Sequence, residues 1–288
     1  MYVIEVIPLR KDTRLGSLSY FSKEPYERGA ILTIAVRGKR AQGVVMRCES
    51  VSLAKAALRS AGFLLRRLPP QKSVYLLPET LRATAEALAE YYAAEPGSVL
   101  FALLPREIRE GQVSALQADA PAGRAFGAPR GGTFSYEILE TPREERLREY
   151  RRTLRVAFAE GKSVLLTVPA LADGEFLYSR LSPGHPKRAV FFHSGLGTRV
   201  LQAAYARINE SREPLLIITT PRHAFLPQSN IGVIILERSR SSAYRDRARP
   251  YLDFRHALLV HARKNTWRLL SADTLLRSED VALAERAP

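Results

Sequence analysis

The residues best suited to chemistry lie at the end of one apolar run. Val233–Leu236 predict a buried strand, and Glu237, Arg238 and Arg240 follow it directly. In nucleotide-hydrolysing motors the equivalent strand ends in carboxylates that bind Mg²⁺ and orient the attacking water. Here a single carboxylate is followed by arginines of the opposite charge. The pattern therefore favours contacts with anions over metal-assisted hydrolysis.

The segment after this strand is rich in arginine. Six arginines follow the carboxyl end of the strand: Arg238, Arg240, Arg245, Arg247, Arg249 and Arg255. A loop that contacts phosphates is one interpretation, and a solvated surface loop is the other. The chain has 44 Lys and Arg against 29 Asp and Glu, a formal charge of +15. That surplus favours a polyanionic partner through counterion release, although a basic protein from an Arg-rich genome would show it too.

Composition excludes several classes of protein. The 288 residues are 46% hydrophobic, which predicts a folded chain with a sizeable core. No apolar run approaches the roughly 20 residues that cross a bilayer, and the N-terminus does not resemble a signal peptide. Cys48 is the only cysteine, so neither an intramolecular disulfide nor a multi-cysteine zinc site is expected. We therefore expect a cytoplasmic protein without zinc.

The first hundred residues predict a β-rich unit. Short apolar or alternating runs at 2–9, 29–37 and 41–48 are typical of strands, and the last two predict a hairpin with a basic tip. Apolar residues on one face predict a helix over 79–94, which Pro96-Gly97 ends. The apolar run at 99–105 then predicts a closing strand.

The remainder of the chain predicts an α/β fold. Residues 106–135 are rich in Gly, Ala and Pro without a sustained period, which indicates a linker. A charged helix is expected over about 143–160. Continuous apolar strands follow at spacings that leave room for crossover helices, which predicts a parallel sheet covered on both faces: 163–169, 188–193, 214–220, 232–236 and 266–272. Such sheets bind ligands at the carboxyl ends of their strands.

Read in order, these strand ends resemble the first motor lobe of the primosomal protein N′ family of replication-restart helicases. The segments that carry the resemblance are LLTVP (165–169), HSGL (193–196), TTPRHAFLP (219–227), NIGVIILERSRSSAYR (230–245) and SADTLLRSED (271–280). The fourth is similar to the family's N-L-G-x-I-I-V-D-E-E-H-D-x-S-Y-K in register throughout. The resemblance implies a RecA-like helicase lobe at 136–288.

The N-terminal residues are similar to the DNA 3′-end-binding domain of the same family. The family's F-D-Y triplet corresponds to Leu18-Ser19-Tyr20, its basic hairpin to Gly29–Val45, and its closing segment to residues 87–105. The resemblance implies a DNA 3′-end-binding domain at 1–105, joined by the 106–135 linker to the lobe.

The nucleotide site that the resemblance would supply is degenerate. The phosphate-loop motif G-V-T-G-S-G-K-T-E-V-Y corresponds to ETPREERLREY at 140–150, which contains no glycine. Backbone amides wrap phosphates only where glycines permit the turn. Arg146 keeps a cation near the lysine position, Glu237 keeps one carboxylate, and Arg238 replaces the residue that would orient water. These departures predict a degenerate Walker A site that has lost ATP and Mg²⁺.

DNA binding is the activity expected to survive. The resemblance assigns base stacking to Tyr20, phosphate contacts to Lys39, Arg40 and Lys55, and close backbone approach to Gly38. Ser19 stands in place of the family's aspartate, which puts recognition of the terminal base in doubt. Tyr20 could equally be a core aromatic. Lys39 and Arg40 could equally be a charged tip that blocks edge pairing.

Three functions follow from these observations. The preferred one is a DNA-binding protein of replication restart that binds single-stranded or forked DNA, or docks replication proteins, without hydrolysing ATP. The second is a fragment of an ATP-dependent 3′-5′ DNA helicase, whose second lobe and zinc-binding cysteines are missing from this sequence. The third is a protein-docking module of the replication machinery, in which side chains fill the former nucleotide cleft. Fold alone does not rank these functions.

Overall fold

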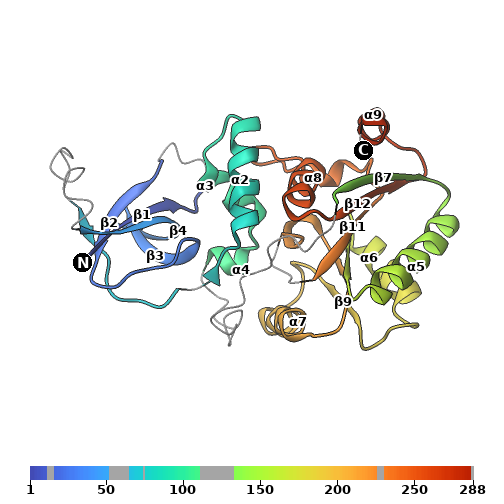
Figure 1. Cartoon of the computed structure of the whole chain (residues 1–288), viewed down its shortest axis with the longest axis horizontal. Helices are drawn as coiled ribbons and strands as arrows, with labels where there is room; N and C mark the ends of the chain where they lie inside the picture. The colour runs from blue at the N-terminus through green and yellow to red at the C-terminus, as the bar shows by residue number, and fades with distance from the viewer. Residues whose placement is uncertain (12–15, 52–64, 74, 111–132, 226–229, 287–288) are drawn as a thin grey trace. The chain divides into compact units, whose positions relative to one another are not determined.

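The computed structural model describes residues 1–11, 16–51, 65–73, 75–110, 133–225 and 230–286. The chain divides into two compact units, Met1–Ala118 and Asp119–Pro288, shown in Figure 1. The division falls inside the 106–135 segment predicted as a linker, much of which lies outside the described residues. Each unit has its own sheet, so the predicted α/β class is confirmed.

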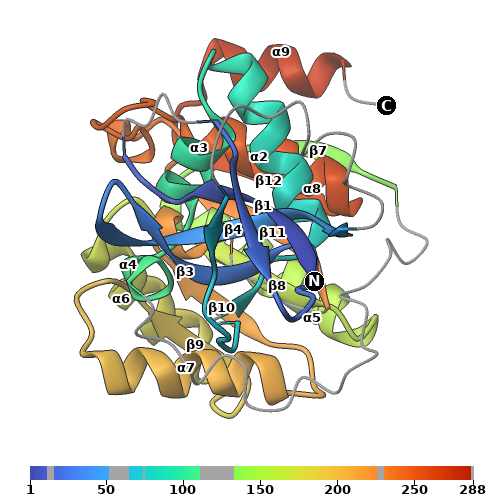
Figure 2. The ribbon, with the colours of Figure 1, turned by 90° about the vertical axis from the view of Figure 1, so that its left-hand side faces the viewer.

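The N-terminal unit is built on a curled mixed sheet of six strands, visible in Figure 2, with the order β5-β2-β1-β4-β3-β6. The strands are β1 (Tyr2–Pro8), β2 (Leu18–Ser22), β3 (Ala30–Val36), β4 (Lys39–Ser50), β5 (Arg66–Arg67) and β6 (Tyr75–Leu76). Only β2 and β5 pair in parallel; the other neighbours are antiparallel. Alternate residues such as Ile4, Val6, Leu32 and Ile34 form the core on one face.

The predicted hairpin between β3 and β4 is confirmed. Its two-residue turn consists of Arg37 and Gly38, with φ of 50° and 78°. Positive φ at both central residues matches the right-handed twist of the flanking strands, and glycine adopts it without strain. The register Val36↔Lys39 therefore places Lys39 and Arg40 at the end of the hairpin, where both are exposed.

Of the two elements predicted after the hairpin, the helix is confirmed and the closing strand is wrong. The helix expected at 79–94 is α2 (Glu79–Tyr91). The strand expected at 99–105 is wrong: α3 (Pro96–Leu103) covers most of it, with Pro96 in its first turn. Because this helix is buried on nearly all sides, its apolar run lacks a helical period and resembles a buried strand. A short helix, α4 (Arg106–Arg109), follows, and Ile108 in it is fully buried.

The second unit contains the predicted parallel sheet. Its order is β7-β12-β11-β8-β10-β9, and every pair is parallel. The strands are β7 (Ser135–Glu140), β8 (Ser163–Thr167), β9 (Ala189–Phe192), β10 (Leu216–Thr219), β11 (Ile231–Glu237) and β12 (Arg268–Asp273). All residues of β8 and β10 are buried, so both faces are covered. The edge strand β7 was not predicted, because only Tyr136 in it is buried.

Helices connect these strands, as Figure 1 shows. The connecting helices are α5 (Arg143–Ala159), α6 (Leu171–Leu181), α7 (Thr198–Glu210) and α8 (Phe254–Asn265), with the short turns η2 (Pro221–His223) and η3 (Ser242–Tyr244). A further helix, α9 (Ser278–Arg286), follows β12. The predicted charged helix is α5, whose Leu147, Tyr150 and Leu154 pack in one core cluster with Val164 and Leu166 of β8.

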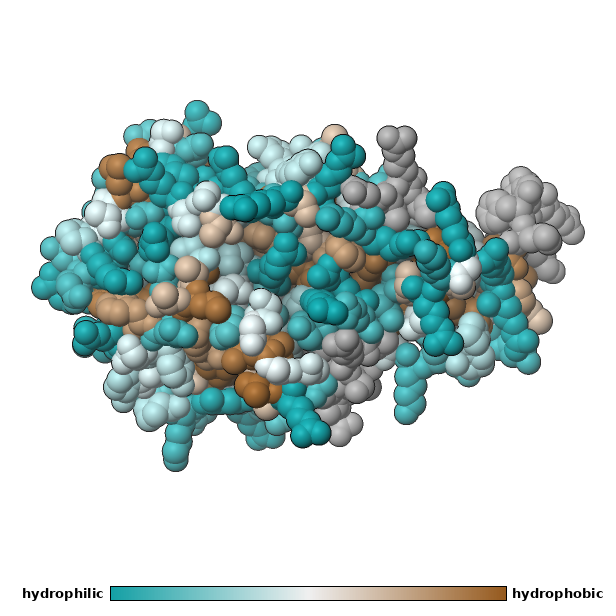
Figure 3. Space-filling view, turned by 180° about the vertical axis from the view of Figure 1, so that it is seen from behind, coloured by the Kyte–Doolittle hydropathy of each residue, from teal (hydrophilic) through white to brown (hydrophobic). Residues whose placement is uncertain are grey.

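No helix in the described part of the chain is both long and apolar enough to span a bilayer. Figure 3 shows apolar side chains as separate patches among hydrophilic ones on the visible face.

Candidate functional site

The carboxyl edge of the parallel sheet brings together the segments that carry the sequence resemblance. Leu236 of β11 pairs with Thr167 of β8, and Glu237 lies beside Ala272 of β12. Asp273 at the end of β12 pairs with Glu140 at the end of β7. Nucleotides and other ligands bind at this edge in parallel α/β sheets. The chemistry available here therefore depends on which side chains occupy it.

A buried ion pair occupies this edge. Arg146 of α5 donates from Nη2 to Oε1 of Glu237 at 2.9 Å and from Nε to Oε2 at 3.2 Å. The two side chains are 3% and 2% exposed. A bidentate geometry of this kind fits the planar guanidinium to the carboxylate. Sequence analysis assigned both residues to a vestigial nucleotide site, and the structure brings them into direct contact.

The third nitrogen of Arg146 is also occupied. Nη1 donates to the carbonyl oxygen of Thr141 at 2.7 Å and to Oγ1 of Thr274 at 3.0 Å. Burial alone lowers the pKa of Arg146, but the hydrogen bonds and charge of Glu237 outweigh burial and raise that pKa above its ordinary value. The guanidinium thus links the turn after β7, the end of β11 and the segment after β12.

The carboxylate of Glu237 has a further donor. The Tyr150 hydroxyl, one helical turn beyond Arg146, donates to Oε2 of Glu237. Burial raises the pKa of Tyr150 strongly, and the neighbouring carboxylate raises it further, so the phenol stays protonated. Glu237 therefore accepts three hydrogen bonds. A Mg²⁺ ion would have to displace these donors, and no group of three or more His, Cys, Asp or Glu suited to a metal occurs in the described ranges.

The connection from β7 to α5 is a short turn. Only Thr141 and Pro142 separate Glu140 of β7 from Arg143 of α5. A phosphate loop of the G-x-x-x-x-G-K-[ST] type uses successive amides from several residues. Here the Thr141 amide donates to the carbonyl of Asp273 at 3.1 Å, and Pro142 has no N–H. The absence of glycine noted in the sequence thus corresponds to a tight strand-to-helix turn.

Arg238 lies apart from this ion pair. Its Nη1 donates to both oxygens of Asp173 in α6, at 3.0 and 3.2 Å. Arg143 approaches the same carboxylate at 3.6 Å. The side chain of Arg238 is 50% exposed, in contrast to that of Arg146. Arg238 therefore does not belong to the buried cluster of Arg146, Glu237 and Tyr150.

The arginine-rich segment divides into exposed and buried members. Arg255 is 4% exposed, and its guanidinium binds Asp253 and backbone carbonyls. Its inclusion in a phosphate-contacting loop is therefore wrong, because the side chain is a structural anchor. The other five are exposed: Arg238, Arg240, Arg245, Arg247 and Arg249.

In the N-terminal unit, Tyr20 lies in the core. It is 4% exposed, and its hydroxyl donates to the carbonyl oxygen of Ala35 at 3.1 Å. Burial raises its pKa, with a small opposing effect from Arg66. Of the two interpretations of Tyr20, the geometry matches the core aromatic, because stacking a base requires an exposed ring face. Lys55 lies outside the described residues.

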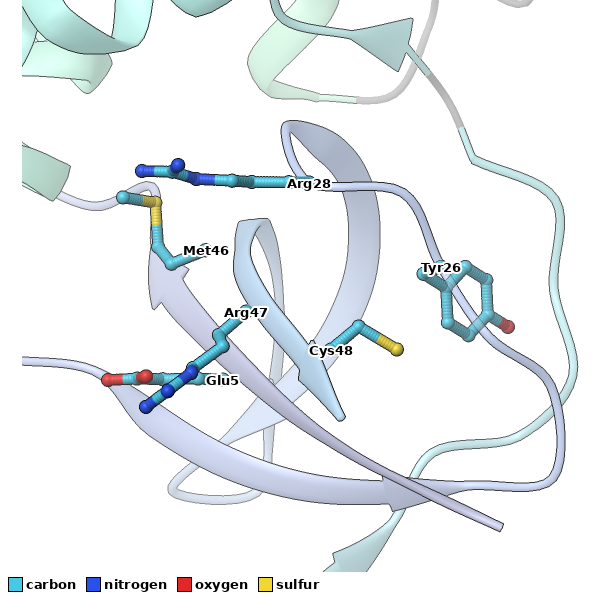
Figure 4. Close-up of a pocket in the computed structure, with 6 residues that line it drawn as sticks. All are labelled: Glu5, Tyr26, Arg28, Met46, Arg47 and Cys48. Atoms are coloured by element: carbon cyan, nitrogen blue, oxygen red, sulfur yellow. The ribbon is translucent and has the colours of Figure 1, made fainter. Parts of the chain in front are cut away.

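Ser19 lies on the opposite face of β2, near a surface pocket. Ser19 is paired with Glu5 of β1, which is paired with Arg47 of β4, so the three side chains share one face. Figure 4 shows the pocket, of about 510 Å³, which is lined by Glu5, Tyr26, Arg28, Met46, Arg47 and Cys48. Sequence reasoning missed Arg28 and Arg47; the only available signal was their positive charge beside predicted strands.

The hairpin tip and the pocket lie far apart on the same sheet. Lys39 and Arg40 begin β4, whereas Arg47 lies seven residues beyond Arg40, about 23 Å along an extended strand. The hairpin tip and the pocket are therefore two separate basic features of the same sheet. A DNA strand would need several nucleotides to reach both.

The fold defines an α/β protein whose second unit is built on an all-parallel sheet. Among curated proteins, two described as "Replication restart protein PriA", from Helicobacter pylori strains J99 and 26695, are similar to this chain. They are 25% identical over 272 residues and 26% identical over 271 residues, covering 92% of this chain in each case. The chain thus has a distant PriA-like relationship, which confirms the resemblance seen in the sequence.

The extent of the match and two further comparisons limit what can be said of this chain's family. The chain spans 41% of the length of these curated relatives. No family model matches. The C-terminal domain of S. cerevisiae Dbp5, solved with Gle1 and IP6, is similar with a TM-score of 0.36 and 16% identity, covering 52% of this chain and 81% of that one. At that TM-score the likeness carries no inference about this chain.

Proposed function

We propose that this chain is a DNA-binding protein of replication restart whose parallel-sheet unit does not hydrolyse ATP. The observation that carries the proposal is the Arg146 guanidinium, which occupies the carboxyl edge of the sheet and holds Glu237. The PriA-like relationship supports the link to DNA replication. The lobe acts as a scaffold, and DNA is the partner.

The loss of ATP hydrolysis is argued from geometry and charge. Phosphoryl transfer requires the phosphate cradle, the metal and the oriented water to be positioned together. The two-residue turn at Thr141-Pro142 cannot wrap a triphosphate, and the one remaining carboxylate already accepts hydrogen bonds from Arg146 and Tyr150. Each element needed for catalysis is replaced by an internal contact.

DNA binding is argued from the charge of the chain and the basic features of its N-terminal unit. The formal charge of +15 favours a polyanion. Gly38, Lys39 and Arg40 form the exposed hairpin tip, which suits contact with phosphates. Arg28 and Arg47 line the pocket on the face that Ser19 shares, which suits a strand end. Single-stranded or forked DNA with a free 3′ end is therefore the proposed ligand.

A fluorescence anisotropy titration with forked DNA tests this function. We expect binding to weaken steeply between low and high salt, with a slope of about 0.7 to 0.9 per phosphate contacted. The double variant Lys39→Glu and Arg40→Glu should reduce the affinity by about tenfold or more. Arg148→Glu with Arg152→Glu, on the exposed face of α5, provides a control with the same change in charge. Binding that is independent of salt would refute the proposal.

The filled edge also favours a second candidate function, a protein-docking module of the replication machinery. In this candidate function the Arg146 guanidinium, which donates to Thr141 and Thr274, fills the edge of the sheet where a nucleotide would lie. Two results together would favour docking: the chain captures a protein partner from a nuclease-treated lysate, and it shows no affinity for DNA. The helicase-fragment hypothesis predicts instead Mg-ATP binding, which a thermal melt detects.

A further inference from the structure

We propose that the outer face of α5 binds a negatively charged helix of a partner protein. We call this surface the α5 arginine face, and it consists of exposed residues of that helix: Arg148, Arg151, Arg152, Arg155 and Val156. The inference goes beyond the proposed function, because the ligand is a protein and the surface lies outside the basic features assigned to DNA. It depends neither on nucleotide nor on DNA.

The inner face of α5 holds the helix firmly on the parallel sheet. Leu147, Tyr150 and Leu154 pack in the core cluster that includes residues of β8, and Arg146 binds Glu237 at the end of β11. Figure 1 shows α5 as an outer helix of the second unit. The backbone that carries the α5 arginine face is therefore fixed before a partner arrives, which reduces the ordering entropy lost on association.

The charge of the α5 arginine face is available to a partner. The side chains of Arg148 and Arg152 are 71% and 73% exposed, and they approach Glu145 and Glu149 only to 3.7 and 3.8 Å. Exposed ion pairs of this kind contribute little to stability, so a partner can replace them. Arg155 is exposed as well, and none of the ion pairs within the described ranges involves it.

Helix α6 extends the positive charge beside α5. Nη2 of Arg151 donates to the carbonyl oxygen of Arg180, an exposed residue near the end of α6, at 3.3 Å. The Arg180 guanidinium lies 5.6 Å from the centre of the Phe176 ring, and Arg143 lies over the same ring at 3.8 Å. A guanidinium placed over a ring keeps the N–H groups at its edge free for carboxylates.

The spacing of the arginines fits a second helix. Arg148, Arg152 and Arg155 follow one another at i, i+4 and i+7, so they lie on one stripe of α5 about 10 Å long. Two helices packed side by side present their side chains at equal intervals. Acidic residues at the same spacing on a partner helix can therefore meet all three arginines together.

Val156 favours a protein over a nucleic acid as the ligand. It is 48% exposed and lies one helical turn after Arg152. An apolar side chain of a partner helix can cover it, whereas a phosphate backbone cannot. Among the large apolar residues exposed in the described part of the chain, Val156 is the one on α5, so this face offers no exposed ring on which a base could stack.

The glutamates of α5 point to the same kind of ligand. Glu145 and Glu149 lie among the arginines and would repel a continuous row of phosphates. A protein helix can instead place a basic residue opposite each glutamate and an acidic one opposite each arginine. A helix that is acidic overall and has one apolar residue is therefore the ligand that complements the whole face.

Designed peptides test this proposal with the full chain. Two fluorescent, alanine-rich helical peptides carry three glutamates and a leucine at the spacing of Arg148, Arg152, Arg155 and Val156, one peptide for each chain direction. We expect at least one of them to bind, with an affinity that falls as salt is added. It should bind about fivefold or more tightly than a peptide of the same charge in which two prolines prevent the helix.

Reversing the charge locates the binding surface. The triple variant Arg148→Glu, Arg152→Glu and Arg155→Glu should lose about tenfold or more in affinity for the glutamate peptide and should gain affinity for the matching lysine peptide. The matched control, Arg240→Glu, Arg247→Glu and Arg249→Glu after β11, changes the charge equally and should alter the affinity by less than about threefold. Circular dichroism should show both variants folded; if the α5 triple does not fold, glutamines at the same three positions keep good helix formers and should show the same loss.

A second variant tests the apolar contact. Val156→Ser should weaken binding of the leucine peptide by about threefold or more and should not affect a peptide with alanine in place of leucine. Equal losses in the two charge-reversed triples, or equal binding of the helical and proline peptides, would show that net charge alone attracts acidic peptides and would overturn the proposal. So would an α5 triple that loses affinity for forked DNA but not for the peptide, because nucleic acid would then occupy the face.

Discussion

Arg146 and Glu237 form a bidentate ion pair between α5 and the end of β11, with both side chains at least 97% buried. The two residues are 91 positions apart in the chain, so the pair fixes how α5 docks onto the sheet. Charges this deeply buried are stable only when every polar atom has a partner. Thr141, Thr274 and Tyr150 provide those further partners.

Removing one member of the pair should destabilise the second unit severely. Arg146→Ala leaves the Glu237 carboxylate buried without its counter-charge, which costs about 3–5 kcal/mol of unfolding free energy. Urea denaturation measures this loss. Arg148→Ala, two residues away and exposed, should change the stability by less than about 0.5 kcal/mol. The double variant Arg146→Met with Glu237→Leu should recover much of the loss, because no unpaired charge remains.

Mg-ATP should not stabilise the chain. A ligand at one hundred times its Kd would stabilise the folded state by about 2.7 kcal/mol and raise the Tm. We expect no rise for the wild type. Arg146→Ala should show none either, because removing the guanidinium leaves the two-residue turn at Thr141-Pro142 unchanged. A Tm that increases with Mg-ATP, in either protein, would contradict the proposed loss of nucleotide binding.

The sequence predicts the parallel sheet well because its strands are continuous apolar runs separated by helix-length segments. It fails at α3, whose burial on all sides removes the helical period, and at β7, whose edge position leaves only Tyr136 buried. The motifs predict Arg146 and Glu237 as remnants of a nucleotide site, and that role stays a prediction. The sequence could not predict that these two side chains bind each other. They are 91 positions apart, so their contact depends on how α5 packs on the sheet.

For the same reason, the sequence could not distinguish the buried arginine of the basic segment from the exposed ones. Residue type alone made Arg255 and Arg249 equivalent members of one basic segment, yet Arg255 is buried and Arg249 is exposed. Asp253, two residues before Arg255, was the available signal, because an acid this close can draw a guanidinium inward. Likewise, the burial of Tyr20 follows from strand alternation, which places it on the face opposite Ser19.

Stability should fall below neutral pH because two histidines are buried in neutral form. Burial lowers the pKa of His223 to about 4, with help from His193 and Arg222, and burial lowers that of His261 to about 4. The unfolded chain takes up protons near pH 6.5, while the folded chain does not until about pH 4. The stabilisation is therefore complete above pH 6.5 and is lost as the pH falls towards 4.

Each histidine contributes up to about 3 kcal/mol over that range, since one pKa unit corresponds to about 1.4 kcal/mol. Urea denaturation at intervals from pH 7 to 4.5 measures the loss. His223→Gln, which keeps a polar partner for the Tyr205 hydroxyl, should flatten the pH dependence. An unchanged slope in this variant would show that His223 does not carry the effect.

Asp280 should control the attachment of α9 to the parallel sheet. This fully buried carboxylate accepts hydrogen bonds from the Tyr136 hydroxyl of β7 at 2.9 Å and from Ser239 Oγ after β11 at 3.2 Å, and it pairs with Arg277. Burial raises the pKa of Asp280, but Arg277 and the two hydroxyl groups outweigh that effect and lower it, so the carboxylate remains charged. One side chain thus joins α9 to two strands.

Asp280→Ala leaves the buried hydroxyl donors of Tyr136 and Ser239 without their acceptor, which should cost more than about 2 kcal/mol. Hydrogen exchange should accelerate in α9 and β7 before it does in β8, because α9 packs on the edge strand while β8 lies inside the sheet. Glu279→Ala, at the exposed neighbouring residue, should change the unfolding free energy by less than about 0.5 kcal/mol. The pattern of hydrogen exchange should stay as in the wild type. Uniformly faster exchange across the sheet would instead mean that Asp280 stabilises the whole unit and has no local role at α9.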